Sequence, residues 1–337
     1  MKRKKILFVR TSADVNAPFV QNDIDLLRKH FDIRIVDFIF TKKNLKGTLE
    51  GIVTLIAGVF WSDLTFSWFA STHAYMAIWL SKLFRKKAVV VVGGLEVAKI
   101  PDINYGFLLN PKSARMVKFI LENADRVLTV DDGLKIDAIK NVGVNGSSIQ
   151  TVALGFNHEK FKPGDEKGKL VITVSKCENW GTVRLKGLDT FVESAKFLPK
   201  VRFVVIGIEG DALTKLKNIA PPNVELIGYI NQKRLGDYYQ KAKVYCQLSL
   251  REAFGCSLGE AMLCGCVPVG TNAQGVKTLI GDTGFYVPYD NPKVTADAIE
   301  KALYSEKGRI ARNRIKVKFT LERREKELIT VIDNLLK

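Results

Sequence analysis

Residues 88–92 read Ala-Val-Val-Val-Val, a run without a polar side chain at any position. Successive residues of a strand face opposite sides of a sheet, so this run is apolar on both faces. A strand of that kind is typical of the centre of a parallel sheet whose two sides are both covered by helices. Residues 88–92 therefore predict an α/β fold.

The same pattern extends outward from this strand through the first half of the chain. Short β-branched runs alternate with helix-length segments, which is typical of a doubly wound parallel sheet. We expect strands at 5–9, 32–38, 64–68, 88–92 and 126–130, and helices at 18–30, 74–84 and 112–123.

A second unit follows a charged stretch with Pro and Gly at residues 157–169, which is typical of a linker. Beyond it we expect strands at 170–174, 202–206, 224–227, 244–248 and 267–269, and helices at 187–197, 232–241, 257–263 and 292–303. The sequence thus predicts two doubly wound units in tandem, with a ligand at the carboxyl ends of the strands, in the cleft between the units. Residues 307–337 form a basic amphipathic pattern, typical of a surface helix, with Ile310, Ile315, Phe319, Leu328, Val331 and Leu335 as its apolar stripe.

The net charge of +17 favours anionic partners such as phosphate-bearing substrates, membrane surfaces or nucleic acid. Residues 1–165 carry 24 Lys and Arg against 16 Asp and Glu, a net of +8, and residues 166–337 carry 28 against 19, a net of +9. A dedicated nucleic-acid patch would be more lopsided, so we expect no nucleic-acid partner. A generally basic, solvated surface explains the same charge.

The five cysteines, at 177, 246, 256, 264 and 266, form no disulfide framework and no set with zinc-ligand spacing. We therefore expect small buried thiols, a reducing cytoplasm and no metal. The basic N-terminus precedes an apolar run only as long as a strand, which does not fit a signal peptide. The uncharged stretch at residues 64–81 holds too many polar side chains for a spanning helix, so we expect a strand, a loop and a buried helix there.

The chemistry is concentrated in residues 249–262, which read Ser-Leu-Arg-Glu-Ala-Phe-Gly-Cys-Ser-Leu-Gly-Glu-Ala-Met. This stretch follows an expected strand and opens an apolar helix. Gly255 permits a tight turn, after which the amides of Cys256, Ser257 and Leu258 form a helix N-terminus suited to a diphosphate. Glu252 and Glu260 flank the turn and fit the two ends of one extended ligand. Alone, both also fit solvated surface carboxylates.

These residues resemble the E-x7-E element of the retaining glycosyltransferases of family four (glycosyl transferases group 1), which have the two-domain GT-B fold. Further similar motifs follow in the family's order. They are Leu-Gly-Phe-Asn at 154–157 with Phe-Lys-Pro at 161–163, Lys-Gly-Leu-Asp at 186–189, the turn at 204–210, Gly-Tyr-Ile at 228–230, Gly-Cys-Val-Pro-Val at 265–269, and Gly275 with Gly-Phe-Tyr-Val at 284–287. The first domain resembles the family mainly in its pattern.

The resemblance implies an organisation of the chain. Residues 1–163 would form a Rossmann-like acceptor-binding domain, and residues 164–310 a Rossmann-like domain that binds the nucleotide-sugar donor. The two domains would face each other across a cleft. Residues 311–337 would form a helix that crosses back to the N-terminal domain.

The resemblance also implies a reaction, the metal-independent transfer of a sugar from a nucleoside diphosphate with retention of configuration (EC 2.4 class). Glu252 would orient the donor sugar, and Glu260 would bind the ribose. Lys186 would offset charge that develops on the diphosphate. Where the family has an Arg, this chain has Lys176, and Arg184 is the alternative. The remaining donor contacts would come from Ala253, Phe254, Gly255, Cys256, Ser257, Leu258, Gly207, Tyr229 and Ile230.

The first domain departs from the family at two loops. Residues 11–18 hold no glycine where members often have two. At residues 93–96 this chain reads Gly-Gly-Leu-Glu, where many members have a His. Gly93 and Gly94 would let a sugar or acceptor approach the backbone, and Glu96 or Asp102 would contact its hydroxyls. A plain turn at the end of a strand explains the same residues.

The acceptor is the least defined part of the prediction. The cations at 85–87, the aromatic stretch at 60–69 and the basic N-terminus suit peripheral docking on the cytoplasmic face of an anionic membrane, with a lipid-linked or polysaccharide acceptor. Core aromatics and a solvated basic loop explain the same residues. Two alternatives to a transferase stay open. One is another GT-B enzyme such as a sugar-nucleotide epimerase, and the other is a polyanion- or nucleic-acid-binding protein without activity. The sequence indicates no separate cofactor, and it names neither the nucleotide, the sugar, the linkage nor the oligomeric state.

Overall fold

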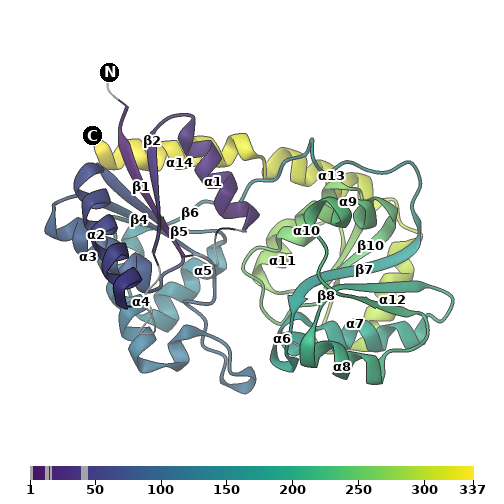
Figure 1. The fold of residues 1–337 in the computed structure, drawn as a ribbon. Helices are drawn as coiled ribbons and strands as arrows, with labels where there is room; N and C mark the ends of the chain where they lie inside the picture. Colours follow the sequence, from purple (N-terminus) through teal and green to yellow (C-terminus); the bar gives the residue numbers. More distant parts are fainter. Residues whose placement is uncertain (1–2, 12–14, 16, 39–44) are drawn as a thin grey trace. The chain divides into compact units, whose positions relative to one another are not determined.

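The computed structural model describes residues 3–11, 15, 17–38 and 45–337, without the side chains of 45 and 46. The chain divides into two compact units (Figure 1). Unit 1 comprises Met1–Leu154 together with Glu322–Lys337, and unit 2 comprises Gly155–Leu321. The sequence suggested a division at residue 163, whereas the compact units divide after Leu154. Part of the glycine-free loop at 11–18 lies outside the described residues.

Unit 1 is built on a six-stranded parallel sheet in the order β2-β1-β3-β4-β5-β6. The valines of β4 are at most 1% exposed, which confirms the central strand predicted at residues 88–92. The strands are β1 (Lys5–Arg10), β2 (Asp32–Asp37), β3 (Leu64–Trp68), β4 (Lys87–Val92), β5 (Arg126–Thr129) and β6 (Ile149–Thr151).

Helices cover both faces of this sheet (Figure 1). Leu7 and Val9 of β1 pack against α2 and α3, while the alternate residues of the strand point to the opposite face. Local signals fix the helix starts, as at α4, where the Asn110 side chain accepts hydrogen bonds from two amides of the first turn. The helices are α1 (Pro18–Arg28), α2 (Leu45–Trp61), α3 (Thr72–Leu83), α4 (Pro111–Asn123), α5 (Asp132–Asp137) and α14 (Leu321–Leu336).

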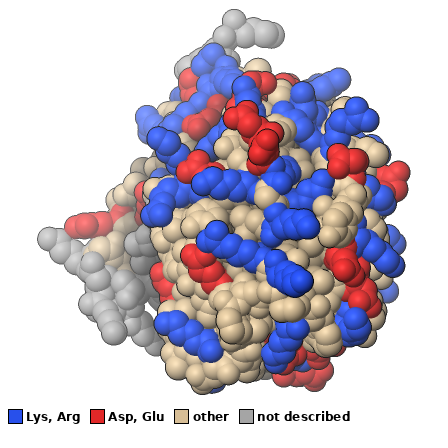
Figure 2. Space-filling model, turned by 90° about the vertical axis from the view of Figure 1, so that its right-hand side faces the viewer, with Lys and Arg blue, Asp and Glu red and all other residues tan. Residues whose placement is uncertain are grey.

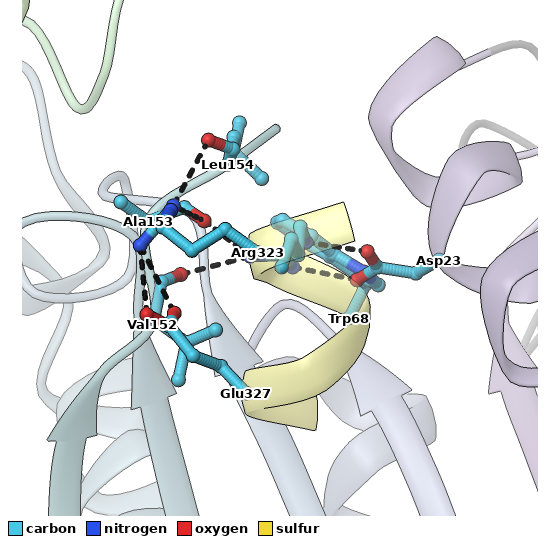
Figure 3. A network of polar contacts seen from close by, with 8 residues as sticks. Asp23, Trp68, Val152, Ala153, Leu154, Arg323 and Glu327 are labelled. Atoms are coloured by element: carbon cyan, nitrogen blue, oxygen red, sulfur yellow. Dashed lines mark hydrogen bonds and ion pairs between the residues drawn. The ribbon is translucent and has the colours of Figure 1, made fainter. Parts of the chain in front are cut away.

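A buried ion pair holds α14 in unit 1 (Figure 3). The Arg324 guanidinium donates to both carboxylate oxygens of Asp23 on α1, each at 2.6 Å, and both side chains are at most 1% exposed. The Trp68 indole N–H donates to the same carboxylate at 2.9 Å, and Arg324 also donates to the carbonyl of Val152 at 2.8 Å. Arg323 donates to the carbonyl of Ala153 at 2.8 Å. These bonds tie the end of the chain to β3, α1 and the segment after β6.

Unit 2 is built on a second six-stranded parallel sheet, in the order β12-β11-β10-β7-β8-β9. The strands are β7 (Gly168–Cys177), β8 (Arg202–Ile208), β9 (Val224–Ile227), β10 (Ala242–Gln247), β11 (Val267–Thr271) and β12 (Phe285–Val287). The helices are α6 (Trp180–Lys186), α7 (Leu188–Ser194), α8 (Gly210–Ile219), α9 (Gln232–Lys241), α10 (Cys256–Leu263), α11 (Gln274–Ile280), α12 (Pro292–Leu303) and α13 (Lys307–Lys318).

The structure contains several elements that the prediction lacked. These are the strands β6 and β12 and the helices α2, α5, α6, α8 and α11. At α2, residues 51–62 carry no charge and hence no polar face to mark a helix. The single basic helix expected at 307–337 is two helices, because the chain turns at Phe319 between α13 and α14. Ile310, expected in the apolar stripe of that helix, is 55% exposed.

The surface is basic without a single concentrated stripe on the face drawn in Figure 2, where Lys and Arg are spread out with Asp and Glu between them. In the described part of the chain, no helix combines the length and apolar character that crossing a membrane requires.

Candidate functional site

The carboxyl ends of β7 and β10 lie side by side where the strand order of unit 2 reverses. From β7 the chain adds β8 and β9 on one side, then crosses over to add β10, β11 and β12 on the other. In doubly wound sheets, ligands bind outside the carboxyl ends of the strands at such a switch point. Lys176 and Lys186 lie on the β7 side, and residues 249–260 follow β10, so the fold brings the predicted donor residues to this edge.

The Glu252 carboxylate sits among polar side chains at this edge. One of its oxygens, Oε2, accepts from Lys186 Nζ at 2.8 Å, from Gln247 Nε2 at 3.0 Å and from Ser249 Oγ at 3.3 Å. The side chains of Glu252 and Lys186 are 12% and 24% exposed. Gln247 and Ser249 are buried, so they hold the carboxylate from the protein side. Glu252 and Lys186 were predicted together, while Gln247 carried no sequence signal.

The turn between Glu252 and α10 has the geometry that the sequence predicted. Gly255 has a φ of 92°, a left-handed conformation that favours glycine. The first backbone bond of α10 runs from the Gly259 amide to the Gly255 carbonyl at 3.1 Å, so the amides of Ser257 and Leu258 precede the hydrogen-bond ladder. Gly275 packs against this turn, where a Cβ would lie 2.7 Å from the backbone of Phe254. The predicted phosphate-binding amides thus lie at the start of α10, next to a turn that packs closely against Gly275.

Phe254 contributes only its backbone to this edge. Its side chain is 2% exposed and stacks on the Phe156 ring, with centroids 5.9 Å apart, and meets the Phe319 ring edge-on at 5.8 Å. The Phe156 ring in turn packs against Gly259, where a Cβ would lie only 2.1 Å from the ring. The aromatic side chains therefore form the support beneath the turn.

Glu260 lies on α10 with two polar partners from α9. Gln232 Nε2 donates to one carboxylate oxygen at 2.7 Å and the Tyr239 hydroxyl to the other at 3.4 Å. Lys160 donates to the amide oxygen of Gln232. Burial raises the pKa of Glu260 to about 7, against the lowering effect of these partners. Gln232 and Tyr239 were not singled out from the sequence, because their spacing from Glu260 is set only by the packing of α9 on α10.

The two candidate cations near β7, Arg184 and Lys176, differ in their ion pairs. Arg184 pairs with Asp189 at 2.6 Å and with Asp290 at 2.9 Å. The Lys176 side chain is 78% exposed, and its Nζ lies 3.6 Å from Glu178. Lys176 is therefore the cation with more freedom to reach a ligand.

The β8 and β9 side of the edge holds the remaining predicted donor residues. Gly207 has a φ of 97°, and a Cβ there would lie 2.5 Å from the Ser175 carbonyl, so only glycine fits against the end of β7. The Tyr229 side chain is 71% exposed, whereas Ile230 is 9% exposed. Glu209 accepts a hydrogen bond from the Tyr229 amide at 3.4 Å. Tyr229 is thus the more accessible of the two predicted base contacts.

The loop after β4 in unit 1 differs from what we expected. Glu96 is 1% exposed, and its carboxylate accepts from the amides of Ala70 and Gly93, each at 3.1 Å, and of Gly94 at 2.8 Å. Burial raises the pKa of Glu96. This burial speaks against the predicted contact of Glu96 with substrate hydroxyls and indicates a structural role. Gly93 is required for packing, because a Cβ there would lie 2.2 Å from the Phe69 ring.

Metal-binding residues are not gathered anywhere in the described chain, where no three His, Cys, Asp or Glu side chains form a candidate site. All five cysteines are free thiols, and four of them are buried. Burial raises the pKa of the Cys177 thiol to about 11. The prediction of small buried thiols therefore holds for all but Cys256, which is partly exposed.

Solved structures with the same fold define the class. A glycosyltransferase from Rickettsia africae superposes with a TM-score of 0.78 at 16% identity, over 100% of both chains. Anabaena HepE, crystallised with UDP and glucose, superposes with a TM-score of 0.78 at 15% identity, over 98% of this chain and 100% of that one. The fold is thus the two-domain α/β fold of the GT-B glycosyltransferases, as predicted. The cleft between the domains stays a prediction.

The family follows from the sequence of unit 2. Residues 157–318 match the family described as Glycosyl transferases group 1, and they form a domain of that family. A phosphatidylinositol N-acetylglucosaminyltransferase subunit of Arabidopsis thaliana is 26% identical over 199 residues, which is 56% of this chain and 44% of the relative. The first curated relatives are each matched over only a third to a half of their own length.

Proposed function

We propose that this protein is a glycosyltransferase that moves a sugar from a nucleoside diphosphate sugar to an acceptor hydroxyl. The observation that carries the proposal is the contact of Glu252 with Lys186 beside the N-terminus of α10, at the switch point of the sheet. A carboxylate, a cation and the first amides of a helix lie at one end of the sheet, with Glu260 further along α10. They suit the three parts of such a donor, which are its sugar, its diphosphate and its ribose.

Each part of the donor has a candidate partner in unit 2. The diphosphate would lie at the start of α10, where backbone amides and the helix dipole favour negative charge. Glu252 would accept from hydroxyls of the transferred sugar through the oxygen that Lys186 leaves unoccupied. Glu260 would accept from the ribose hydroxyls, and Tyr229 would contact the base.

Two lysines near the diphosphate would assist the cleavage of the bond to the sugar. When the bond between the anomeric carbon and the diphosphate breaks, negative charge grows on the departing phosphate oxygens. Lys186 and Lys176 would stabilise that charge more in the transition state than in the bound substrate, which lowers the barrier. Retention of configuration and independence from metal ions rest on the family resemblance.

The acceptor is proposed to be lipid-linked or a polysaccharide. The plant relative is named for a phosphatidylinositol substrate, which supports a lipid acceptor here. The excess of Lys and Arg over Asp and Glu supports work at an anionic membrane on the cytoplasmic side, as a peripheral protein.

The test is to incubate the protein with UDP-, GDP- and ADP-sugars in the presence of EDTA and to follow donor consumption and the anomeric form of the free sugar by NMR. We expect slow hydrolysis of one donor with release of the retained anomer, and loss of this activity in Glu252→Gln. Glu225→Gln, a change in β9 away from the carboxyl ends of β7 and β10, is the matched control. Release of the inverted anomer, or conversion of the donor into another nucleotide sugar, would contradict the proposal.

A further inference from the structure

The helix α2 of unit 1 is apolar on its exposed side as well as on its buried side. Leu55 and Val59 are fully buried in the cluster that α2 forms with β1 and β2. On other turns of the same helix, four large apolar side chains are exposed, and these are Leu49 (63%), Val53 (65%), Ile56 (38%) and Phe60 (71%). A helix on a protein surface normally shows polar side chains on its outer face. The exposed face of α2 therefore needs an explanation other than folding.

The exposed residues of α2 form one line along the helix. They recur at intervals of four, three and four residues, which places them on the same face. Glu50 and Thr54, which are also exposed, fall outside this line at the spacing of an α-helix. From residue 51 to residue 62 the chain has no charged side chain to interrupt it.

The neighbouring helix α3 widens this apolar face. Figure 1 shows α2 and α3 on the same side of the sheet of unit 1. The Phe60 and Phe84 rings meet edge-on with centroids 6.1 Å apart, which joins the end of α2 to the end of α3. Trp79 and Leu83, one turn apart on α3, are 46% and 61% exposed. We call the set Leu49, Val53, Ile56, Phe60, Trp79 and Leu83 the apolar stripe.

Cations border the apolar stripe where α2 and α3 end. Lys82 lies within the last turn of α3, and Arg85 and Lys86 follow it directly. In the described part of the chain none of these three side chains has an ion pair, and Lys82 and Arg85 are exposed. At the end of α2, Arg34 and Lys5 lie over the Trp61 ring, at 4.1 Å and 5.3 Å from its centroid.

We infer that the apolar stripe inserts into the headgroup region of an anionic membrane, with Lys82, Arg85 and Lys86 on the lipid phosphates. The apolar stripe includes Trp79 and lies beside cations without ion pairs among the described residues, which matches the chemistry of an anionic lipid surface. A second copy of this basic chain would bring like charges together at the same border. The inference rests on the proposed function for its purpose, which is to bring unit 1 to a lipid-linked acceptor.

The structure moves the docking surface away from part of the segment that the sequence suggested. Of the aromatic stretch at 60–69, Phe66 and Trp68 are at most 1% exposed and belong to the core. Phe60 is the exposed aromatic side chain at the start of that stretch, and the other apolar contacts come from α3 and from the unpredicted helix α2. The cations at 85 and 86 keep the role that was proposed for them.

The test is flotation of the full chain with vesicles of phosphatidylcholine, with and without phosphatidylglycerol, at low salt. We expect binding to the anionic vesicles only. The double variant Val53→Glu/Phe60→Glu should bind at least about tenfold more weakly, because each change removes a large apolar contact with the lipid. Thr54→Glu, an exposed change on the same helix outside the stripe, is the matched control and should bind nearly as well as the wild type.

A second variant separates the cations from the stripe. Lys82→Ser/Arg85→Ser/Lys86→Ser should weaken binding at low salt and lose that difference at high salt, because salt screens the contact with lipid phosphates. Unchanged melting temperatures would show that each variant is folded.

Three results would overturn the inference. The first is absence of binding by the wild type, and the second is equal binding by the Val53→Glu/Phe60→Glu variant. The third is a wild-type dimer that does not form in this variant, which would mean that a second copy of the chain covers the stripe. Thermal stabilisation by a nucleotide sugar, measured on the same samples, reports on the donor site alone. A docking failure with intact donor binding therefore leaves the proposed function standing.

Discussion

Two glutamates that follow central strands show how differently the two units use the same residue. Glu96 comes four residues after β4 in unit 1, and Glu252 comes five residues after β10 in unit 2. The Glu96 carboxylate is buried and taken up by three backbone amides. The Glu252 carboxylate is partly exposed and held by three side chains on one oxygen.

The difference separates a carboxylate that shapes a loop from one that can meet a ligand. Backbone amides cannot move away without rearranging the loop, so Glu96 is committed to the fold. Side-chain donors such as Lys186 can turn toward a bound phosphate, and the second oxygen of Glu252 has no hydrogen bond among the described residues. Substitutions at four carboxylates test this distinction.

The largest effect should come from Asp23, the carboxylate of unit 1 that pairs with Arg324. In Asp23→Ala the buried guanidinium loses its partner, which should lower the free energy of unfolding by about 3–5 kcal/mol. Chemical denaturation followed by circular dichroism measures the loss. Asp25→Ala, an exposed carboxylate on the same helix, should change stability little. Equal losses in the two variants would mean that the Asp23–Arg324 pair does not anchor α14.

Glu252→Gln should leave the fold intact and impair the reaction. Removal of the charge misplaces both the donor sugar and Lys186, which should lower kcat about 100-fold or more. Rate assays with the accepted donor give the loss, and the melting temperature shows that the variant is folded. A Glu252→Gln protein with wild-type kcat would put the reacting centre elsewhere.

Glu96→Gln should lower the stability of the fold and leave donor binding intact. A glutamine has only one acceptor oxygen for the amides that Glu96 serves, so the change should cost about 1–3 kcal/mol of stability. Nucleotide-sugar binding, which we propose for unit 2, should be unchanged. Glu122→Gln, a change of an exposed carboxylate on α4 of the same unit, serves as the control. Loss of transfer activity without loss of stability would instead make Glu96 a substrate contact.

Glu260 should give the smallest effect, as a dependence of donor affinity on pH. Its pKa of about 7 lies above the ordinary value, so the group gains a proton as the pH falls below 7. The protonated form accepts less well from ribose hydroxyls, and affinity should fall by up to about tenfold per pH unit on the acid side. Lys160 and Tyr239 face Glu260, and burial raises the pKa of Tyr239 well above this range.

Calorimetry at several pH values measures this trend in donor affinity. A Glu260→Gln protein, which has no carboxyl group to titrate at this position, should bind the donor with a flatter dependence on pH. A Glu260→Gln protein that keeps the wild-type dependence would exclude Glu260 as its source.

The strand, turn and helix of the candidate site in unit 2 were predicted because their signals are local. A strand, a glycine turn and a helix follow one another within residues 244–263, and each signal sits next to the residues that it positions. The strands at 64–68 and 224–227 and the helices at 232–241 and 292–303 have the predicted bounds. The partners of Glu260 escaped prediction because they come from α9, across a helix packing contact.

Three features of unit 1 escaped prediction for physical reasons. The helix α2 lacks the polar face by which amphipathic helices are found, so an apolar run of 12 uncharged residues gave no period. The Asp23–Arg324 pair joins residues that are 301 positions apart, which no local pattern can indicate. The inward turn of Glu96 likewise depends on an amide beyond the end of the neighbouring strand, at Ala70.

We propose that a nucleotide sugar binds at the carboxyl ends of β7 and β10. The most direct measurement is a thermal-shift screen of UDP-, GDP- and ADP-sugars against the wild type and Glu260→Ala. We predict that at least one of them raises the melting temperature of the wild type, and that the rise is smaller or absent in the variant. Absence of stabilisation by all three, or an equal rise in both proteins, would contradict the claim.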